Sequence, residues 1–452
     1  MTFPADFRWG VATAAYQIEG AVDVDGRGES IWDRFSHTPG KTFNGDTGDL
    51  ACDHYHRYGE DVELMARLGI RAYRFSIAWP RLFPSGAGRP NRKGIDFYAR
   101  LVDRLLADGI APAITLYHWD LPQALQDTGG WANRDTARRF GDYADAAFRA
   151  LGDRVALWIT HNEPWVAAFL GHFTGDHAPG VADLRTALAA AHHLLLSHGL
   201  AVDAYRGLGL SAPIGITLNL YPTYPHSDTS ADVEAALTAD GYTNRWFLDP
   251  VLRATYPDDM LALFADRMGP LDFVRDGDLS VAGRAIDFLG VNYYTRGVIR
   301  AAPAQPFGYE AVDPLERRAP VTDMPTEIAP DALTDLLARL KRDYREIPLY
   351  ITENGAAFND RIDADGQVRD ARRVEFLRSH FAAAARAIEK GVPLRGYFVW
   401  SFMDNFEWAY GYSKRFGLVY VDYATQRRVP KSSASFFREV IEQNEIPEEA
   451  AV

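Results

Sequence analysis

The sequence predicts an α/β protein built as a single (β/α)8 TIM barrel, because strand-like and helix-like segments alternate from end to end. Eight short apolar runs bounded by turn residues are typical of strands buried on both faces. These runs are 9–16, 72–78, 111–117, 156–160, 214–219, 287–294, 349–352 and 396–401. Eight parallel strands close into a barrel, and an open doubly wound sheet is the alternative. No glycine-rich phosphate-binding sequence follows the first run, which weighs against the nucleotide-binding form of that sheet.

Several intervening segments carry apolar residues at helical spacing together with signals for helix ends. In one of them, apolar residues recur every three or four positions between residues 95 and 105, and Gly109 follows as a stop. Asn133 is placed to cap the next helix. Asp370 precedes another helix, and Pro330 is placed to open one more. These helices supply the α part of the repeating unit.

The domain organisation is expected to be simple, because no Gly/Ser-rich linker, short repeat or low-complexity tract interrupts the chain. We expect one catalytic domain over residues 1–452, with about the last ten residues as a disordered tail. Residues 301–325 are the longest segment without clear periodicity. We expect them to form a long βα loop at the catalytic face of the barrel, around the active-site pocket.

Composition excludes several classes of partner. The 452-residue chain has 47% hydrophobic and 24% charged residues, which is typical of a globular protein with a large core. Its net charge of −13 disfavours a nucleic-acid partner. No run of 18 apolar residues is present, so no membrane association is expected. The N-terminus lacks a basic stretch followed by an apolar core, so we expect a cytoplasmic protein, either a monomer or a homo-oligomer.

Neither a disulfide nor a bound metal is expected. The chain has one cysteine, Cys52, which cannot form an intramolecular disulfide. His54 and His56 lie close to it in the sequence, but this spacing matches no common zinc pattern. We therefore predict no metal site and no cofactor.

Two glutamates, Glu163 and Glu353, stand where strand-like runs end, at the rim where a pocket can form. Cleaving a glycosidic bond needs one carboxylic acid to protonate the leaving oxygen. It also needs an ionised carboxylate to attack the anomeric carbon or activate water. The two groups need different environments, so that only one pKa is raised. Either glutamate alone could simply pair with a surface arginine, but the pair indicates glycoside hydrolysis.

The other strand ends supply groups that suit a sugar. They are Gln17 after the first run, Arg74 within the second, His118 and Trp119 after the third, Asn292 and Tyr294 in the sixth, and Trp400, Glu407 and Trp408 at the eighth. A hexopyranose presents a ring of hydroxyl groups, which carboxylates and amides bind, and an apolar C–H face, which an indole covers. The strand ends therefore favour a carbohydrate ligand.

These residues lie within motifs through which the chain resembles the β-glucosidases of glycoside hydrolase family 1. The resemblance runs from Phe7 to about Phe437, nearly the whole chain. The motifs are Tyr73–Arg81, the segment around His118, Asn162-Glu163-Pro164, Thr352-Glu353-Asn354-Gly355 and Trp400–Trp408, all in the family's order. One such motif would be a weak signal, whereas five in order are highly specific.

The resemblance implies a retaining (β/α)8 glycosidase with assigned catalytic residues. Glu163 corresponds to the general acid/base and Glu353 to the nucleophile, with their carboxyl groups about 5–5.5 Å apart. Arg74 and Tyr294 correspond to residues that keep the nucleophile ionised and oriented, since a nearby cation lowers the pKa of a carboxyl group.

The resemblance also implies how the sugar is held. The implied substrate-binding residues are Gln17, His118, Trp119, Asn162, Asn292, Trp400, Glu407 and Trp408. Asn162 is expected to contact the 2-hydroxyl group, and Trp400 to stack beneath the sugar ring. The expected activity is exo-acting hydrolysis of small β-glycosides at terminal β-D-glucosyl residues, with some activity toward β-fucosyl or β-galactosyl residues.

Other activities on the same scaffold stay open. A 6-phospho-β-glycosidase is disfavoured because the carboxylate of Glu407 would repel a phosphate. In addition, Phe416 stands where a phosphate-binding tyrosine would be expected, although Lys414 is near. A transglycosidase and a non-catalytic sugar-binding barrel are the further alternatives.

One departure from the family concerns the leaving-group side. Thr326 stands where the family commonly places a tryptophan that forms the platform for the leaving-group sugar. Without that platform, stacking in the outer subsite is weaker. We therefore expect varied leaving groups to be accepted, with no strong preference for cellobiose.

Overall fold

The computed structural model describes residues 1–344 and 346–448 and contains a closed barrel of eight parallel strands. In barrel order the strands are β1 (Arg8–Ala12), β11 (Leu394–Trp400), β10 (Leu349–Asn354), β7 (Phe288–Asn292), β5 (Ile214–Asn219), β4 (Leu157–Asn162), β3 (Ala111–Tyr117) and β2 (Ala72–Ser76). Each predicted run overlaps one of these strands, and every neighbouring pair is parallel. The (β/α)8 barrel is therefore confirmed.

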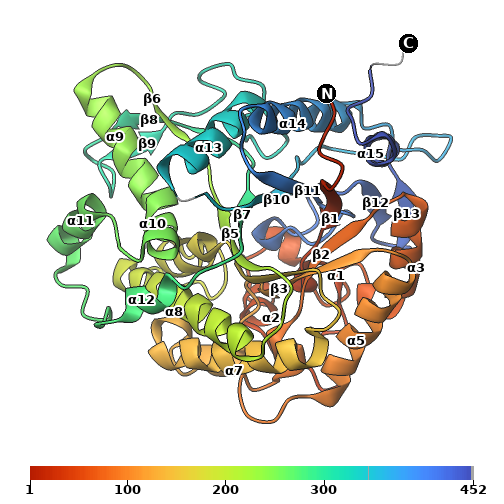
Figure 1. Cartoon of the computed structure of the whole chain (residues 1–452), viewed down its shortest axis with the longest axis horizontal. Helices are drawn as coiled ribbons and strands as arrows, with labels where there is room; N and C mark the ends of the chain where they lie inside the picture. Colours follow the sequence, from red (N-terminus) through yellow and green to blue (C-terminus); the bar gives the residue numbers. More distant parts are fainter. Residues whose placement is uncertain (345, 449–452) are drawn as a thin grey trace.

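Helices surround the strands (Figure 1). The longer ones are α3 (His54–Arg67), α5 (Arg92–Ala107), α7 (Arg134–Leu151), α8 (Leu184–Gly207), α9 (Ser230–Asp240), α11 (Asp258–Met268), α13 (Pro330–Asp343), α14 (Ala371–Glu389) and α15 (Ser432–Gln443). Shorter ones are α1 (Ala15–Ile18), α2 (Ile31–Ser36), α4 (Trp79–Leu82), α6 (Gln123–Gln126), α10 (Trp246–Arg253), α12 (Asp278–Ala282) and the π-helical segments η3 (Val166–Thr174) and η4 (Gly241–Arg245).

The predicted helix starts have the expected chemistry at two of three positions. The Asn133 side chain accepts a hydrogen bond from the Asp135 amide at the start of α7, and Pro330 occupies the first turn of α13. Asp370 precedes α14 but makes no capping bond to it. Its carboxylate instead accepts bonds from Arg373 and Ser433.

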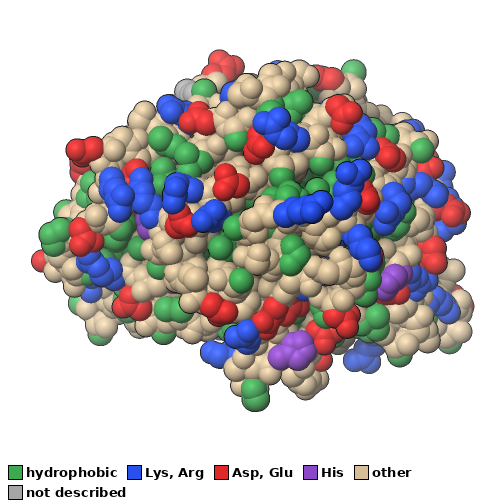
Figure 2. Space-filling model, turned by 90° about the horizontal axis from the view of Figure 1, so that it is seen from below, with side chains coloured by type: hydrophobic (Ala, Val, Ile, Leu, Met, Phe, Trp, Pro, Cys, Tyr) green, Lys and Arg blue, Asp and Glu red, His purple; other side chains and the backbone are tan. Residues whose placement is uncertain are grey.

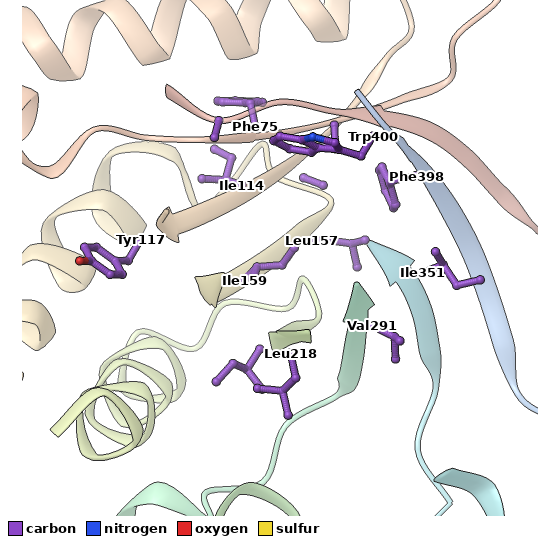
Figure 3. Packing of buried hydrophobic residues seen from close by; sticks show 14 of the residues in the cluster. Phe75, Ile114, Tyr117, Leu157, Ile159, Leu218, Val291, Ile351, Phe398 and Trp400 are labelled. Carbon is purple, nitrogen blue, oxygen red and sulfur yellow. The ribbon is translucent and has the colours of Figure 1, made fainter. Parts of the chain in front are cut away.

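The barrel core is built from the apolar residues that marked the strands in the sequence. Ile114 of β3, Leu157 of β4, Val291 of β7 and Ile351 of β10 are almost completely buried in one hydrophobic cluster. Figure 3 shows these side chains lying on neighbouring strands of the ring. Burial of both strand faces explains why the runs are continuous rather than alternating.

Two predicted segments differ from the structure. The first run was expected to extend to Tyr16, but β1 ends at Ala12 because residues 15–18 turn into α1, where the Ala15 amide donates to Ser76 Oγ. Within residues 301–325 the chain is not a plain loop. Strand β8 (Gly297–Ala301) pairs with β9 (Tyr309–Ala311) and β6 (Thr223–Pro225), because Ile299 and Tyr309 cover the alanine-rich face of α9.

The two ends of the chain meet at one side of the barrel. The Asn444 side chain accepts a hydrogen bond from Trp9 Nε1 and donates one to the carbonyl of Phe3. The backbone of Glu445 forms an isolated antiparallel β-bridge with Thr2. The predicted disordered tail thus begins in a segment that contacts the N-terminus. Its last four residues, 449–452, lie outside the described residues.

The surface mixes both signs of charge. Figure 2 shows basic and acidic side chains lying next to one another over one face. Ion pairs also join opposite charges, as between Arg149 and Asp145 on α7 and between Arg154 and Asp103. Within residues 1–344 and 346–448, none of the helices combines the length and apolar character that crossing a membrane requires.

Candidate active site

A cavity of about 250 Å³ lies at the carboxyl ends of the barrel strands. It is lined by His118, Trp119, Glu163, Tyr294, Met324, Thr326, Glu353, Trp400, Glu407, Trp408 and Phe416. A second cavity of about 650 Å³ shares four of these residues and lies beside it. The smaller cavity suits a single sugar ring, and the larger one suits whatever is attached to that ring.

The two glutamates, Glu163 directly after β4 and Glu353 in β10, are buried in this cavity and have different partners. Glu353 Oε1 accepts a bond of 2.6 Å from Arg74 Nη1, and its Oε2 accepts one of 2.7 Å from the Tyr294 hydroxyl group. Glu163 Oε1 accepts a bond of 2.6 Å from Asn292 Nδ2. Only Glu353 therefore faces a cation directly, whereas Glu163 meets a neutral amide.

Asn162 joins several of the predicted residues into one network. Its Oδ1 accepts bonds from Arg74 Nη2 at 2.6 Å and from Asn292 Nδ2 at 3.0 Å. Its Nδ2 lies 3.0 Å from His118 Nε2, and since an amide nitrogen donates, this imidazole nitrogen accepts. Burial and the charge of Arg74 lower the pKa of His118, which agrees with a neutral ring.

Gln17 holds the segment that carries Glu407. Its Nε2 donates to Asn405 Oδ1 at 3.0 Å, to the Phe406 carbonyl at 2.9 Å and to Glu407 Oε2 at 3.4 Å. These bonds fix the orientation of the Gln17 amide group. Its buried Oε1 has no hydrogen-bond partner among the described residues, so it is free to accept a hydrogen bond from a hydroxyl group of a ligand.

Indole rings form the apolar wall of the cavity. The Trp400 ring lies nearly parallel to the His118 imidazole, and the rings of Trp119 and Trp408 are 4.6 Å apart. The end of β10 approaches Trp400 so closely that a Cβ atom on Gly355 would lie 1.7 Å from the Trp400 carbonyl oxygen. Glycine is therefore required there, between the strand end of Glu353 and that of Trp400.

The pKa values of the carboxyl groups agree with the expectation for Glu163 but only in part for Glu353. Burial and the negative charge of Glu353 raise the pKa of Glu163 to about 8. Arg74 and Tyr294 lower the pKa of Glu353, as predicted, but burial outweighs them and the net shift is upward. Burial and the Glu353 charge also raise the pKa of Glu407 to about 8. Because only Glu353 touches Arg74, it is the group best placed to carry the charge.

Eight of the twelve predicted site residues thus line one cavity, and the other four, Gln17, Arg74, Asn162 and Asn292, each hydrogen-bond to a residue that lines it. The chain also matches a known family over nearly its whole length. A sequence profile of the family described as glycosyl hydrolase family 1 matches residues 1–446. The chain belongs to glycosyl hydrolase family 1.

Curated relatives and solved structures agree with this family 1 membership. The chain is 52% identical to "Beta-glucosidase A" of Acetivibrio thermocellus, over 98% of this chain and 99% of that protein. It is 48% identical to a "Bifunctional beta-D-glucosidase/beta-D-fucosidase" of Bifidobacterium breve, over 98% of each. The structure of a family 1 β-glucosidase from Thermotoga maritima superimposes with a TM-score of 0.95 at 48% identity, covering 99% of both chains.

Three residues of this family 1 site hold a strained backbone. Trp119 (φ 78°), Glu163 (φ 48°) and Trp408 (φ 51°) all adopt the left-handed region that non-glycine residues avoid. Such strain persists where surrounding structure enforces it, and it clusters at functional sites. It directs these three side chains into the cavity.

A layer of threonines beneath the site was not predicted. Arg74 Nε donates to Thr115 Oγ1 at 3.2 Å, and Thr352 Oγ1 donates to Asn292 Oδ1 at 2.8 Å. Thr217 Oγ1 in turn donates to Thr352 Oγ1 at 3.1 Å. The only signal in the sequence was a polar residue inside each apolar run, which does not say which side chain it will meet across the barrel.

The segment around Thr326 forms the outer edge of the cavity. Thr326 and Met324 line it, and the Thr326 hydroxyl lies 2.6 Å from that of Thr322. Lys414 Nζ donates to the Asp323 carbonyl at 2.8 Å. The Lys414 side chain is therefore tied to this segment.

Proposed function

We propose that this family 1 chain is an exo-acting, retaining β-glucosidase that releases terminal non-reducing β-D-glucosyl residues. The observation that carries the proposal is the asymmetric pair of buried carboxyl groups. Glu353 is bonded to Arg74 and Tyr294, while Glu163 has a pKa raised to about 8 and keeps its proton at neutral pH. The names of the similar proteins, a β-glucosidase and a β-glucosidase/β-fucosidase, support the same activity.

The first chemical step is glycosylation. Glu163 gives its proton to the glycosidic oxygen as that bond breaks, and a carboxylate oxygen of Glu353 attacks the anomeric carbon from the opposite face. The leaving group departs as a neutral alcohol, and the sugar stays bound to Glu353 as an α-linked ester. Arg74 and Tyr294 hold the attacking carboxylate in position through both of its oxygens.

The second step is hydrolysis of the ester. Once Glu353 is esterified, its negative charge no longer raises the pKa of Glu163, so Glu163 stays ionised and accepts a proton from water. The water attacks the anomeric carbon, the ester bond breaks, and β-glucose leaves with its original configuration. Glu353 is again a carboxylate and Glu163 again an acid.

The arrangement of the two carboxyl groups supports retention. Asn292 donates to Glu163 at 2.6 Å, and the same Asn292 on β7 is the register partner of Glu353 on β10. Both carboxyl groups therefore lie near one amide side chain, and we expect their separation to fall in the shorter range. Retaining glycosidases have carboxyl groups about 5–5.5 Å apart, while inverting ones need about 6.5–9.5 Å.

Recognition of the sugar is assigned to the polar residues around the cavity. We propose that Gln17 and Glu407 bind the hydroxyl groups at the 4- and 6-positions and that Asn162 binds the 2-hydroxyl. The unpartnered Gln17 Oε1, among the described residues, supports the first assignment. Trp400 is the proposed platform beneath the ring. A single carboxylate does not fully enforce the configuration at C4, so we also propose activity on β-fucosides.

Stereochemistry and substrate charge test this proposal together. Proton NMR during hydrolysis of 4-nitrophenyl β-D-glucoside is expected to show β-glucose first, followed by slow mutarotation. First appearance of the α-anomer would contradict retention. The 6-phosphate of the same glucoside is expected to be a poor substrate. If it is cleaved faster than the glucoside, the activity is that of a 6-phospho-β-glycosidase and the proposed β-glucosidase activity is wrong.

Cytoplasmic location, oligomeric state and a part in cellulose degradation stay predictions.

A further inference from the structure

A buried cluster of six charged side chains joins loops that follow the strands of the active site. We call it the ionic cluster, and its members are Asp360, Asp370, Arg373, Asp404, Arg415 and Lys431. It holds three positive and three negative charges. At its centre, Lys431 Nζ lies 2.5 Å from Asp360 Oδ2 and 2.7 Å from Asp404 Oδ1. The side chains of Lys431 and Asp404 are fully buried.

Stability alone does not explain this cluster. Removing charges from water costs several kcal/mol per ion, and a buried ion pair often adds nothing over well-packed apolar residues. Buried polar groups can instead hold neighbouring segments in one arrangement.

The ionic cluster joins the two loops that follow β10 and β11. Asp360 belongs to the loop that follows Glu353. Asp404 belongs to the loop that follows Trp400, three residues before Glu407. Arg373 of α14 also donates to the Arg415 carbonyl at 2.8 Å, which adds a second tie to that loop.

The segment that bears Glu407 is thus held from both sides. From the cavity side, Gln17 bonds to Asn405, Phe406 and Glu407. On the side of the ionic cluster, both carboxylate oxygens of Asp404 accept hydrogen bonds. Oδ1 accepts them from Lys431 and the Gly417 amide, and Oδ2 accepts one of 2.7 Å from Arg415. This leaves the backbone before Glu407 little freedom to shift.

We propose that Lys431 is a positioning residue that acts through Asp404 to fix Glu407 relative to Glu353, and so sets the preference for sugars that carry a 6-hydroxyl group. The inference rests on the proposed role of Glu407 in binding that hydroxyl. Loss of Lys431 would let the segment move by a fraction of an ångström. Glu353, held separately by Arg74 and Tyr294, would keep its place.

The test compares two substrates that differ only at C6, 4-nitrophenyl β-D-glucoside and its 6-deoxy analogue. The natural chain is expected to prefer the glucoside by about 10-fold or more in kcat/KM, as a hydrogen bond to a charged group allows. The double variant Lys431→Met with Asp360→Asn removes the central cation and keeps the cluster neutral. We expect it to lower that preference by about 5-fold or more, with a much smaller change for the 6-deoxy substrate.

Two further variants guard against misfolding and general damage. Asp404→Asn preserves the shape of the side chain, and we expect it to lower the same preference by a smaller factor. Arg339→Met removes a comparable ion pair with Asp240, which joins α13 to α9, and is expected to change stability but not the preference. If the cluster variants lose kcat/KM equally on both substrates, or keep the preference unchanged, the inference about Lys431 is wrong while the proposed function stands. A natural chain with no preference at C6 would overturn the proposed role of Glu407 as well.

Discussion

At the scale of single residues, Glu163 is held in two costly states at once. Its backbone adopts a left-handed conformation with φ 48°, which only glycine adopts without penalty. Its carboxyl group is buried next to a second carboxyl group, which raises its pKa to about 8. Both costs bring a protonated acid to the place where the glycosidic oxygen would lie. Two predictions separate the effect of the charge from the effect of the backbone.

The first prediction concerns pH. Because the acid role needs the protonated form, kcat/KM is expected to be lost as the pH rises through about 8 and Glu163 loses its proton. Replacing Glu353 by glutamine removes the nearby charge, so the pKa of Glu163 should fall. Titration of ¹³C-labelled glutamate by NMR measures this pKa in both proteins. An unchanged pKa in Glu353→Gln would refute the electrostatic explanation.

The second prediction concerns stability. Alanine normally stabilises a chain relative to glycine by about 0.5–1 kcal/mol, because glycine loses more conformational freedom on folding. At position 163 the order should reverse, with Glu163→Gly more stable than Glu163→Ala by about 1 kcal/mol, because only glycine relieves the left-handed strain. Both variants remove the carboxyl group, so they are matched in activity. Urea denaturation compares them, and a more stable alanine variant would rule out strain at this residue.

At the scale of elements, the segment between β9 and α13 forms the edge of the site on the leaving-group side. Salt bridges hold it in place, since Glu327 pairs with Arg296 and Arg317, and Asp323 pairs with Arg372. Thr326 therefore offers a short side chain on a fixed backbone, with no aromatic surface for a second sugar. This restraint makes the position suitable for a test by substitution.

The prediction is that Thr326→Trp improves binding of a second sugar. A tryptophan there is expected to lower KM for cellobiose by about 2- to 10-fold, since ring stacking contributes about 0.5–1.5 kcal/mol. Methyl β-D-glucoside, whose leaving group is too small to reach the ring, should be hydrolysed as before. Steady-state kinetics on both substrates decide the matter. A natural chain that already strongly prefers cellobiose over aryl glucosides would contradict the assumed weak outer subsite.

At the scale of the whole molecule, the barrel buries many histidines in their neutral form. Burial is the largest cause that lowers the pKa of each of these residues: His118, His161, His172, His177, His192, His193, His198 and His380. An unfolded histidine has a pKa near 6.5, so below that pH the unfolded chain binds protons that the folded chain excludes. Folding stability should therefore fall as the pH drops from about 6.5 toward 4.

The measurement is the urea midpoint between pH 7 and pH 4.5. A histidine whose folded pKa lies well below its unfolded value costs up to about 1.4 kcal/mol for each pH unit below about 6.5. Three carboxyl groups with pKa values raised to about 8, those of Asp120, Glu163 and Glu407, oppose the loss, but they are fewer. His198→Gln should flatten the curve, because burial lowers the pKa of His198. A midpoint that does not fall would contradict this account.

The sequence predicted the barrel well because each strand is marked by its own local pattern. A buried run such as 111–117 needs no distant partner to be recognised, and β3 has those same limits. The end of the first strand was misplaced because α1 starts where Ala15 bonds to Ser76, a contact between distant segments. The β8–β9 hairpin was missed for a similar reason, since its apolar residues are ordered by packing on α9.

The functional site shows the same difference between local patterns, which the sequence reveals, and contacts between distant segments, which it does not. Residues at strand ends could be collected from the sequence, because parallel strands of a barrel end at one rim. The threonine layer and the ionic cluster could not, because the bonds that assemble them join segments far apart in the chain, as between Lys431 and Asp360 or Thr217 and Thr352. The net pKa shift of Glu353 was also missed, since it depends on how deeply the group is buried against Arg74.

The assignment of Glu353 as nucleophile and Glu163 as acid/base is the centre of the account. Its most direct test is Glu353→Gly assayed with an activated aryl β-glucoside in the presence and absence of azide. Without azide this variant should be inactive, and with azide it should form α-glucosyl azide, because the small anion attacks from the face that Glu353 occupied. Glu163→Gly should instead give the β-azide. Rescue of Glu353→Gly that yields only β-product would contradict the assignment.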